Sequence, residues 1–142
     1  MKVLIDTNIV LDFLLERAPF LEDAELLFQS IDSGRVVGYV TATTLTDIFY
    51  IARRHTGSIE KARQALSEIL TAMELCPVNR AVVESAFNSD VADFEDAIQI
   101  ACAAVQELDA IVTRDTQGFV NSPVLTLSVQ AFLQKLGEQN SE

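Results

Sequence analysis

Four short apolar runs constrain the fold of this chain more than any other feature of its sequence. They are mostly continuous, rich in β-branched residues, and span residues 3–5, 36–40, 110–113 and 124–127. A strand that is apolar at consecutive positions buries both of its faces, which is typical of a parallel sheet covered on both sides. Parallel neighbours cannot be joined by a tight turn, so we expect helices between these strands.

Helical patterns do lie between the apolar runs. The clearest has apolar residues every three or four positions from Ile59 to Met73, with Ser58 as a candidate N-cap. A second begins at Pro19 and stops at Gly34, which follows the preference for proline at a helix start and glycine past its end. Two more helices are predicted, at residues 44–55 and 93–108. The alternation predicts an α/β fold, a three-layer sandwich whose mostly parallel central sheet is flanked by helices.

The size and composition of the chain predict one domain. Its 142 residues, 49% of them hydrophobic, suffice for a single core, which we place at residues 1–136, with a frayed tail at 137–142. No apolar run reaches the roughly 18 residues of a membrane span, and the N-terminus shows no export signal. Cys76 and Cys102 each lie in an apolar segment, which predicts two buried, reduced thiols in a cytoplasmic protein.

The charge balance is strongly acidic, because 10 Lys and Arg against 21 Asp and Glu give a formal net charge of −11. Such a surplus disfavours nucleic acid as a ligand unless divalent cations compensate it, and it favours a basic protein partner. His55 is the only histidine and both cysteines have apolar settings, which excludes most zinc sites. Any metal bound by this chain is therefore expected to have oxygen ligands.

Five aspartates fall where predicted strands end or predicted helices begin: Asp6, Asp47, Asp93, Asp96 and Asp115. The carboxyl ends of parallel strands meet at one edge of a sheet, and ligands bind there. Carboxylates gathered at that edge repel one another, and a hard cation such as Mg²⁺ or Mn²⁺ relieves the repulsion. Two such ions can activate water and stabilise the leaving oxygen in phosphodiester hydrolysis. The pattern therefore predicts a metal site built from four or five carboxylates.

Each of these acids also has a purely structural interpretation. Asp93 with Asp96, and Thr44 with Asp47, have the spacing of helix capping pairs. The two aspartates at strand ends have comparable interpretations, as a helix cap and as a turn residue. Capping does not explain why two separate strands end in aspartate at the same edge, so the joint pattern favours a functional site.

Three motifs point to the same site. They are a strand that runs into Asp6-Thr7-Asn8, a helix start at Asp93-Phe94-Glu95-Asp96-Ala97, and a strand end at Thr113-Arg114-Asp115 followed by Gly118-Phe119. In this order and at these spacings, the chain resembles the PIN-domain ribonucleases, in particular the toxins of VapBC-type toxin–antitoxin pairs. The resemblance spans nearly the whole chain, from Met1 to about Phe119.

The resemblance implies a set of metal ligands among the aspartates. Asp6, Asp96 and Asp115 are the implied main ligands of Mg²⁺ or Mn²⁺, with Asp93 as a helper. Asp47 stands where many members of the family carry glutamate, and its shorter side chain leaves contact through a water or a weakened site as alternatives. Two neighbouring residues are expected to orient the water or a ligand carboxylate, namely Asn8 and Thr113.

The resemblance also implies a function, namely metal-dependent endonucleolytic cleavage of RNA, with a structured RNA such as tRNA as the substrate. It implies a small antitoxin that blocks the pocket. It further implies a homodimer, for which the apolar helices around residues 20–33 and 44–55 are the candidate contacts.

Several polar residues around the aspartates have competing interpretations. Asn8 and Asp12 are four residues apart on the first predicted helix, which favours a solvated face for Asp12. Arg53 and Arg54 end their helix, where they either meet the negative end of the helix dipole or form a rim that contacts RNA phosphates. Arg114, beside the last aspartate, either neutralises the acids or contacts RNA.

Two rival functions remain open. The first is an inactive PIN-like module that only binds a protein or RNA, which the shortened Asp47 and the acidic charge favour. The second is a phosphoacceptor or a phosphatase, because those proteins also present an aspartate at a strand end. The sequence disfavours the second, since it has Asn8 where a phosphatase of the haloacid-dehalogenase type carries aspartate.

Overall fold

In the computed structural model, which describes residues 1–140, five strands form one all-parallel sheet. Their order across the sheet is β3-β2-β1-β4-β5. The strands are β1 (Lys2–Ile5), β2 (Val37–Thr41), β3 (Glu74–Cys76), β4 (Ala110–Val112) and β5 (Thr126–Leu127). Strand β1 is central, and its Leu4 is in register with Tyr39 of β2 and with Ile111 of β4. The predicted parallel sheet is confirmed.

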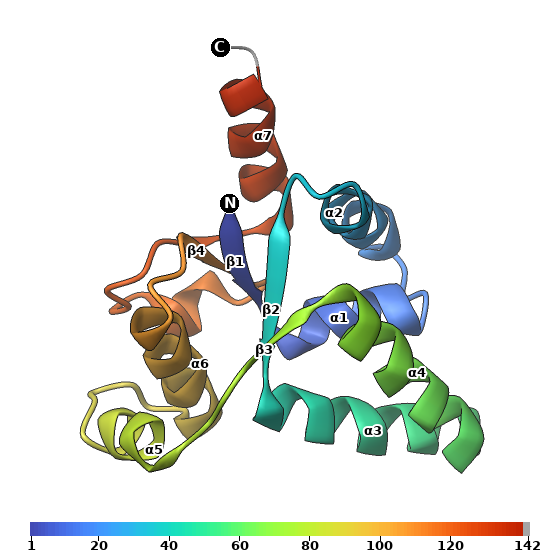
Figure 1. The fold of residues 1–142 in the computed structure, drawn as a ribbon, viewed down its shortest axis with the longest axis horizontal. Coiled ribbons are helices and arrows are strands. Elements are labelled where there is room, and N and C mark those ends of the chain that lie inside the picture. The colour runs from blue at the N-terminus through green and yellow to red at the C-terminus, as the bar shows by residue number, and fades with distance from the viewer. Residues whose placement is uncertain (141–142) are drawn as a thin grey trace.

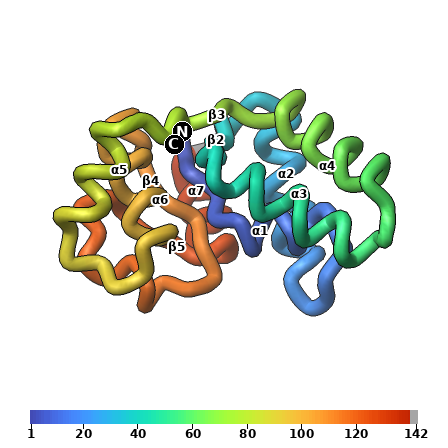
Figure 2. The backbone as a smooth tube through the Cα atoms, turned by 90° about the horizontal axis from the view of Figure 1, so that it is seen from below, coloured from blue at the N-terminus to red at the C-terminus, as the bar shows by residue number. Residues whose placement is uncertain are grey.

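Helices cover both faces of this sheet, which confirms the three-layer α/β sandwich. They are α1 (Thr7–Leu14), α2 (Leu21–Asp32), α3 (Ala42–Thr56), α4 (Ile59–Ala72), α5 (Arg80–Phe87), α6 (Phe94–Val105) and α7 (Val129–Asn140), with a 3-10 turn, η1, at Thr116–Phe119. Figures 1 and 2 show α5 and α6 on one side of the strands and α1 to α4 on the other.

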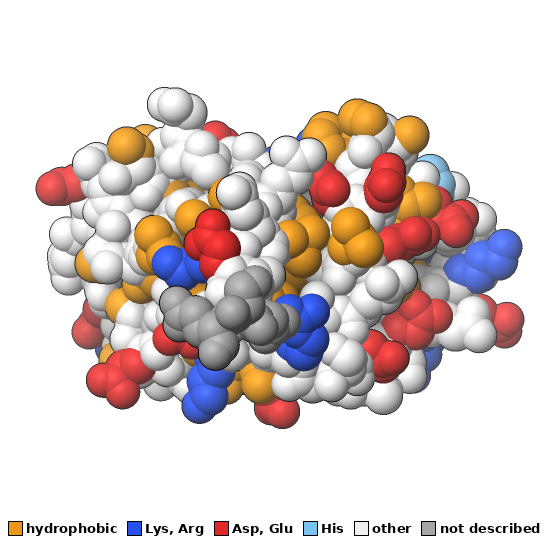
Figure 3. Space-filling view, turned by 90° about the horizontal axis from the view of Figure 1, so that it is seen from above, with side chains coloured by type: hydrophobic (Ala, Val, Ile, Leu, Met, Phe, Trp, Pro, Cys, Tyr) orange, Lys and Arg blue, Asp and Glu red, His pale blue; other side chains and the backbone are white. Residues whose placement is uncertain are grey.

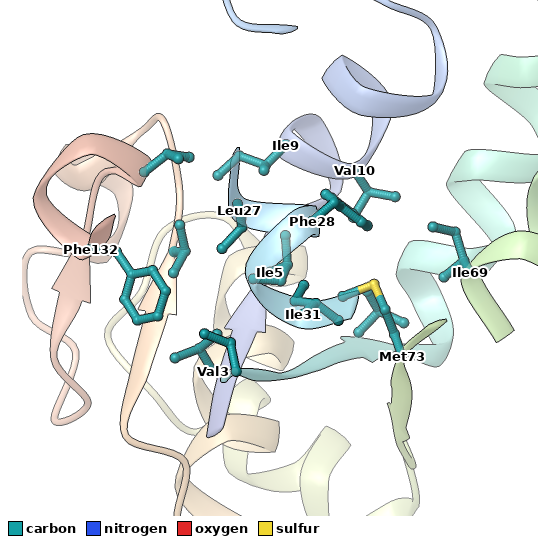
Figure 4. Packing of buried hydrophobic residues seen from close by; sticks show 14 of the residues in the cluster. Val3, Ile5, Ile9, Val10, Leu27, Phe28, Ile31, Ile69, Met73 and Phe132 are labelled. Carbon is teal, nitrogen blue, oxygen red and sulfur yellow. The ribbon is translucent and has the colours of Figure 1, made fainter. Parts of the chain in front are cut away.

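The alternation of side chains along β1 divides the core into two parts. Val3 and Ile5 pack with α1, α2, α4 and α7, as Figure 4 shows, whereas Leu4 packs on the other face against α5 and α6. Val3, Leu4 and Ile5 have no solvent exposure, whereas Lys2 at the start of β1 is exposed. Successive residues of a strand point to opposite faces, so a continuous apolar run is what a strand in the middle layer requires.

Most predicted helix boundaries hold to within a few residues. The Ser58 hydroxyl accepts from the Lys61 amide at 3.2 Å and caps α4, as predicted. Helix α3 ends at Gly57, whose φ of +68° is a conformation that glycine adopts without strain. Helix α2 begins at Leu21, not at Pro19, although it stops before Gly34 as expected.

The sequence patterns did not reveal three elements: β3, α5 and α7. Strand β3 has three residues, two of them exposed, and so it carries no apolar run. Helix α7 continues through Gly137 to Asn140, and the last two residues of the predicted tail at 137–142 lie outside the described range. In residues 1–140, no helix has the length and apolar character of a membrane span.

The strand order creates a crevice at one edge of the sheet. From β1 the chain builds β2 and β3 outward on one side, and then crosses over to place β4 and β5 on the other side of β1. At such a switch point the loops leaving neighbouring strands diverge, and the space between them is the usual ligand site of open α/β sheets. The residues that follow β1 and β4 therefore face each other there.

Candidate active site

Asp6 directly follows β1, at this edge of the sheet. It is 8% exposed, and it caps α1 by accepting from the Thr7 amide at 2.8 Å through Oδ1. The same oxygen accepts from Nε2 of Gln99 at 3.0 Å, and Oδ2 accepts from the Thr113 hydroxyl at 2.7 Å. Three donors from three elements thus hold the carboxylate in one orientation, so its capping and its functional interpretations are compatible.

Asp96 lies in the first turn of α6 and faces the same crevice. Asp93 caps this helix, with Oδ1 accepting from the Asp96 amide at 2.9 Å. Burial, followed by the negative charges of Asp93, Asp6 and Asp115, raises the pKa of Asp96 to about 6. The other three predicted metal ligands therefore lie within electrostatic reach of Asp96.

Asp115 follows β4 and caps η1 by accepting from the Gly118 amide at 3.2 Å. A Cβ at Gly118 would lie 2.9 Å from Asp96 Oδ2 and 3.0 Å from Asp115 Oδ2, so these two oxygens face the same point beside the glycine. That point borders a hollow of about 360 Å³, which Asp90 and Asp93 also line. Glycine leaves the space between the carboxylates open.

Asp47 meets a carboxyl group that sequence reasoning missed, Glu95. The side chain of Asp47, in α3, is hydrogen-bonded to that of Glu95, in α6. This hydrogen bond, then burial, then the charges of Asp47, Asp6 and Asp93 raise the pKa of Glu95 to about 8. A hydrogen bond between two carboxyl groups requires one proton, and the raised pKa of Glu95 indicates that Glu95 carries it. In the sequence, the only signal for Glu95 was its place in the first turn of the helix that begins after Asp93. Its partner, Asp47, is 48 residues earlier in the chain, so the sequence did not indicate their contact.

The predicted capping pair of Thr44 and Asp47 is wrong. Thr41 caps α3, because its hydroxyl accepts from the Thr44 amide at 3.2 Å. Thr44 is buried in the first turn, and its hydroxyl lies 2.9 Å from that of Thr7. This contact links the start of α3 to the residue after Asp6, and so it ties the end of β2 to the end of β1.

The carboxylates have the chemistry of a divalent-cation site. In the described part of the chain, no three His, Cys, Asp or Glu side chains are already arranged around a common metal position. The donors are nevertheless the hard oxygens that Mg²⁺ and Mn²⁺ prefer. Burial is the main cause of the raised pKa of Asp96, and the charges of Asp93, Asp6 and Asp115 raise it further, a repulsion that a bound cation would relieve. Together with the open space beside Gly118, this donor set fits a divalent cation.

Of the two residues expected to orient a water or a ligand, the structure brings one to the acids. Thr113 is fully buried, and its hydroxyl bonds Asp6 and also accepts from the Asp115 amide at 3.1 Å. Asn8 is exposed, and its side-chain oxygen lies 3.5 Å from Nη2 of Arg17. No hydrogen bond recorded for the described residues joins the Asn8 side chain to the acids.

Asp12 is buried, so its predicted place on a solvated helix face is wrong. Its Oδ1 lies 2.8 Å from Nη2 of Arg17, and its Oδ2 lies 3.0 Å from Nε of Arg114. The Arg114 guanidinium also stacks 3.8 Å from the centre of the Phe20 ring. The expectation that Arg114 neutralises the acid cluster is therefore wrong, because its charge partner is Asp12. The four-residue spacing was misleading because a tertiary neighbour covers that face of α1.

Arg53 and Arg54 lie exposed in the last turn of α3, together with His55. Seven residues of helix between Asp47 and Arg54 correspond to about 10 Å, so these cations stand beside the crevice and not in it. On the opposite face, at the N-terminal ends of the strands, Figure 3 shows basic and acidic side chains intermingled. The positions of Arg53 and Arg54 are equally compatible with an interaction with the negative end of the helix dipole and with a peripheral contact to RNA phosphates.

Both cysteines are buried and unpaired with each other, as predicted. Burial, with the neighbouring Cys102, raises the pKa of the Cys76 thiol to about 12, and burial raises that of Cys102 to about 11. Neither is a thiolate at neutral pH. Neither therefore acts as a nucleophile or as a metal ligand at the crevice.

Comparison with known proteins agrees with this geometry. The sequence matches the PIN domain over residues 2–117, and no curated protein matches it. Among solved structures, VapBC2 from Rickettsia felis, bound to a DNA fragment from its promoter, superposes with a TM-score of 0.66 at 15% identity, covering 90% of this chain and 98% of that one.

Two further structures show the same fold. The DNA-bound VapBC of Salmonella typhimurium has a TM-score of 0.67 at 16% identity, over 90% of this chain and 97% of that one. VapC20 of Mycobacterium tuberculosis, described as a Sarcin-Ricin loop cleaving toxin, has a TM-score of 0.63 at 18% identity, over 77% of this chain and 86% of that one.

Proposed function

The chain belongs to the PIN domain family, and on that premise we propose that it is a metal-dependent endoribonuclease, the toxin of a toxin–antitoxin pair. One observation carries the proposal. Asp96 feels the charges of Asp93, Asp6 and Asp115 at the switch point of the sheet, which is where an open α/β fold binds its ligands. Capping alone does not require carboxylates from three separate loops to converge.

The cation would be held by Asp6, Asp93, Asp96 and Asp115, and its chemistry suits Mg²⁺ or Mn²⁺. When bound, such an ion lowers the pKa of water and offsets the charge that develops on a phosphodiester. The rest of the site is supplied by the chain. Asp6 is held in one orientation by its three donors, from Thr7, Gln99 and Thr113.

The chain also supplies a proton beside the site. The carboxyl pair of Asp47 and Glu95 holds one near neutral pH, since the pKa of Glu95 is raised to about 8. We propose that this pair takes the place of the glutamate that many members of the family carry at position 47. Asp47 is one methylene shorter than that glutamate, and it is hydrogen-bonded to Glu95 of α6. We propose that Asp47 acts in catalysis through this pair.

RNA as the substrate follows from the family and from the basic residues beside the crevice. Arg53 and Arg54 are exposed and would contact phosphates, while Arg114 has its guanidinium on Asp12. Because the net charge of −11 repels RNA, a bound divalent cation is needed to reduce the repulsion between the carboxylates and the RNA phosphates. Metal binding and RNA binding are therefore expected to depend on each other.

The antitoxin in this proposal is a small protein whose basic segment covers the acidic crevice. Support comes from the VapBC structures of the same fold and from the charge of the chain. We also propose a cytoplasmic location, consistent with the two free cysteines, and a homodimer through α2 and α3. Tyr50 and Ile51 of α3, both exposed, are apolar side chains for such a contact.

The deciding experiment is thermal unfolding in EDTA, Mg²⁺ or Mn²⁺, followed by an RNA cleavage assay. Divalent ions should raise the midpoint of the wild type, because they bind the native state, and should raise that of Asp96→Asn much less. Asp32→Asn, an exposed carboxylate at the end of α2, is the matched control and should respond like the wild type. RNA cleavage should disappear in Asp6→Asn and Asp96→Asn.

The result that contradicts the proposal is also specific. If neither ion moves the midpoint of the wild type and the purified protein leaves RNA intact, the carboxylates serve only as caps. The protein would then be the inactive binding module, an alternative favoured by the lack of a preformed metal position among the described residues.

A further inference from the structure

We infer that Arg114 is a positioning residue for the acid cluster. Its guanidinium is anchored on Asp12 of α1, and this anchor holds the turn after β4, residues 113–115, against the end of β1. The inference rests on the proposed function, since it assigns Arg114 a role in the same site. It replaces the interpretation of Arg114 as a residue that contacts RNA.

The anchor point is a buried charge. The Asp12 side chain is 2% exposed, and a carboxylate in such a place is stable only when it is paired and hydrogen-bonded. Both of its oxygens are used, Oδ1 mainly by Arg17 and Oδ2 by Arg114. A contact of this kind is far more rigid than an exposed ion pair, because neither partner can exchange to water without leaving a buried charge.

The two arginines on Asp12 differ in what they connect. Arg17 closes a local loop, because its amide donates to the Asp12 carbonyl at 3.0 Å and its Nη2 to the Asn8 carbonyl at 2.9 Å. Arg114 is 102 residues away, so its bond to Asp12 joins the exit of β4 to α1. The cation–π contact of the Arg114 guanidinium with the Phe20 ring is a second restraint on the same side chain.

Arg114 stands between the two residues that the acid cluster needs. Thr113 bonds Asp6 on one side of the turn, and the Asp115 amide bonds Thr113. Arg114 lies at a bend after β4, and its side chain goes to Asp12 instead of to the acid cluster. The turn is thus held from both sides, and loss of the Arg114 anchor should let it pivot about Thr113.

The test compares Arg114→Gln with Arg17→Gln. Both arginine side chains are 33% exposed, and either variant leaves Asp12 with one arginine, so both should fold and lose similar stability. In metal-free protein, hydrogen exchange of the Asp115 amide should become about tenfold faster in Arg114→Gln and remain unchanged in Arg17→Gln. In the cleavage assay, kcat should fall about 10- to 100-fold in Arg114→Gln with KM unchanged, because a supporting contact is lost and not a substrate contact.

Two outcomes overturn the inference. Equal exchange of the Asp115 amide in the two variants would show that Arg114 contributes only stability. A raised KM with unchanged kcat in Arg114→Gln would make it a residue that contacts RNA. If the wild type cleaves no RNA, the proposed function fails on its own, and the amide exchange in metal-free protein still decides whether Arg114 positions the turn.

Discussion

The Thr113 hydroxyl donates a hydrogen bond of 2.7 Å to Asp6 Oδ2, across the space between the ends of β4 and β1. The hydroxyl oxygen of Thr113 also accepts from the Asp115 amide at 3.1 Å, so one buried hydroxyl links the Asp6 carboxylate to the backbone of Asp115. A threonine after a strand is unremarkable in a sequence. Here its position makes the geometry of the site depend on a single side chain.

Thr113→Val should therefore reduce activity more than stability. Valine keeps the shape of the side chain but removes both hydrogen bonds, and we expect kcat to fall about 10- to 100-fold. The unfolding free energy should fall by about 2 kcal/mol, since the net contribution of each of the two lost hydrogen bonds is about 1 kcal/mol. Kinetics on an RNA substrate and urea unfolding measure the two effects. Thr113→Ser retains the hydroxyl and should keep most activity; equal losses in both variants would count against this role.

Gly118→Ala should weaken divalent-cation binding. The added Cβ would lie within 3.0 Å of carboxylate oxygens of Asp96 and Asp115, so at least one carboxylate must move. We expect the Mn²⁺ affinity, measured by calorimetric titration, to fall about tenfold. Gly137→Ala is the matched control, because no atom lies within 4 Å of the added Cβ, and its affinity should equal that of the wild type. An unchanged affinity in Gly118→Ala would place the cation elsewhere.

The metal-free protein should lose stability as the pH rises from about 4.5 to 8. In the folded state the pKa values of Asp96 and Glu95 are raised to about 6 and about 8, from ordinary values of 3.8 and 4.5. Between those limits the folded chain holds protons that the unfolded chain has released, so the unfolding free energy decreases with pH.

Thermal unfolding in EDTA across this range measures the effect. Glu95→Gln should flatten the upper part of the dependence, and Asp96→Asn the lower part, because each removes one of the two titrating groups. Saturating Mn²⁺ should reverse the trend, since it binds the ionised carboxylates. A midpoint that rises with pH in EDTA would show that the acids do not repel one another in the folded protein.

Gln99→Leu should impair cleavage at little cost in stability. Gln99 is 1% exposed and donates to Asp6, while its Oε1 is buried without a hydrogen-bond partner. Leucine removes the donor that orients Asp6, and it also removes an unsatisfied oxygen whose burial is unfavourable. We expect about a tenfold loss in kcat, with a change in unfolding free energy below about 1 kcal/mol. A large loss of stability with unchanged kcat would make Gln99 a core residue only.

The acids that were predicted and the acid that was missed differ in one respect. Asp6, Asp96 and Asp115 are attached to the ends of strands or to a helix start, and their place follows from the alternation of apolar runs alone. Glu95 matters because it meets Asp47, and nothing local to either residue signals that contact. The prediction that Asp12 is solvated was wrong for the same reason. Helical spacing predicts which residues share a face of the helix, but not which other residues, here Arg17 and Arg114, pack against that face.

The sequence by itself determined the class of fold, most helix boundaries and the edge of the sheet where the carboxylates meet. These properties follow from the periodicity of apolar residues, from helix-capping residues, and from the glycines and prolines that end helices. All of these signals act between residues that are close in the sequence. Only the tertiary structure decided which polar side chains are paired: Arg114 with Asp12, Glu95 with Asp47, and Thr113 with Asp6. Electrostatic and hydrogen-bonding energies depend on the distance between two groups and on their burial. Side chains that are many residues apart in the sequence become close and buried only when the sheet assembles.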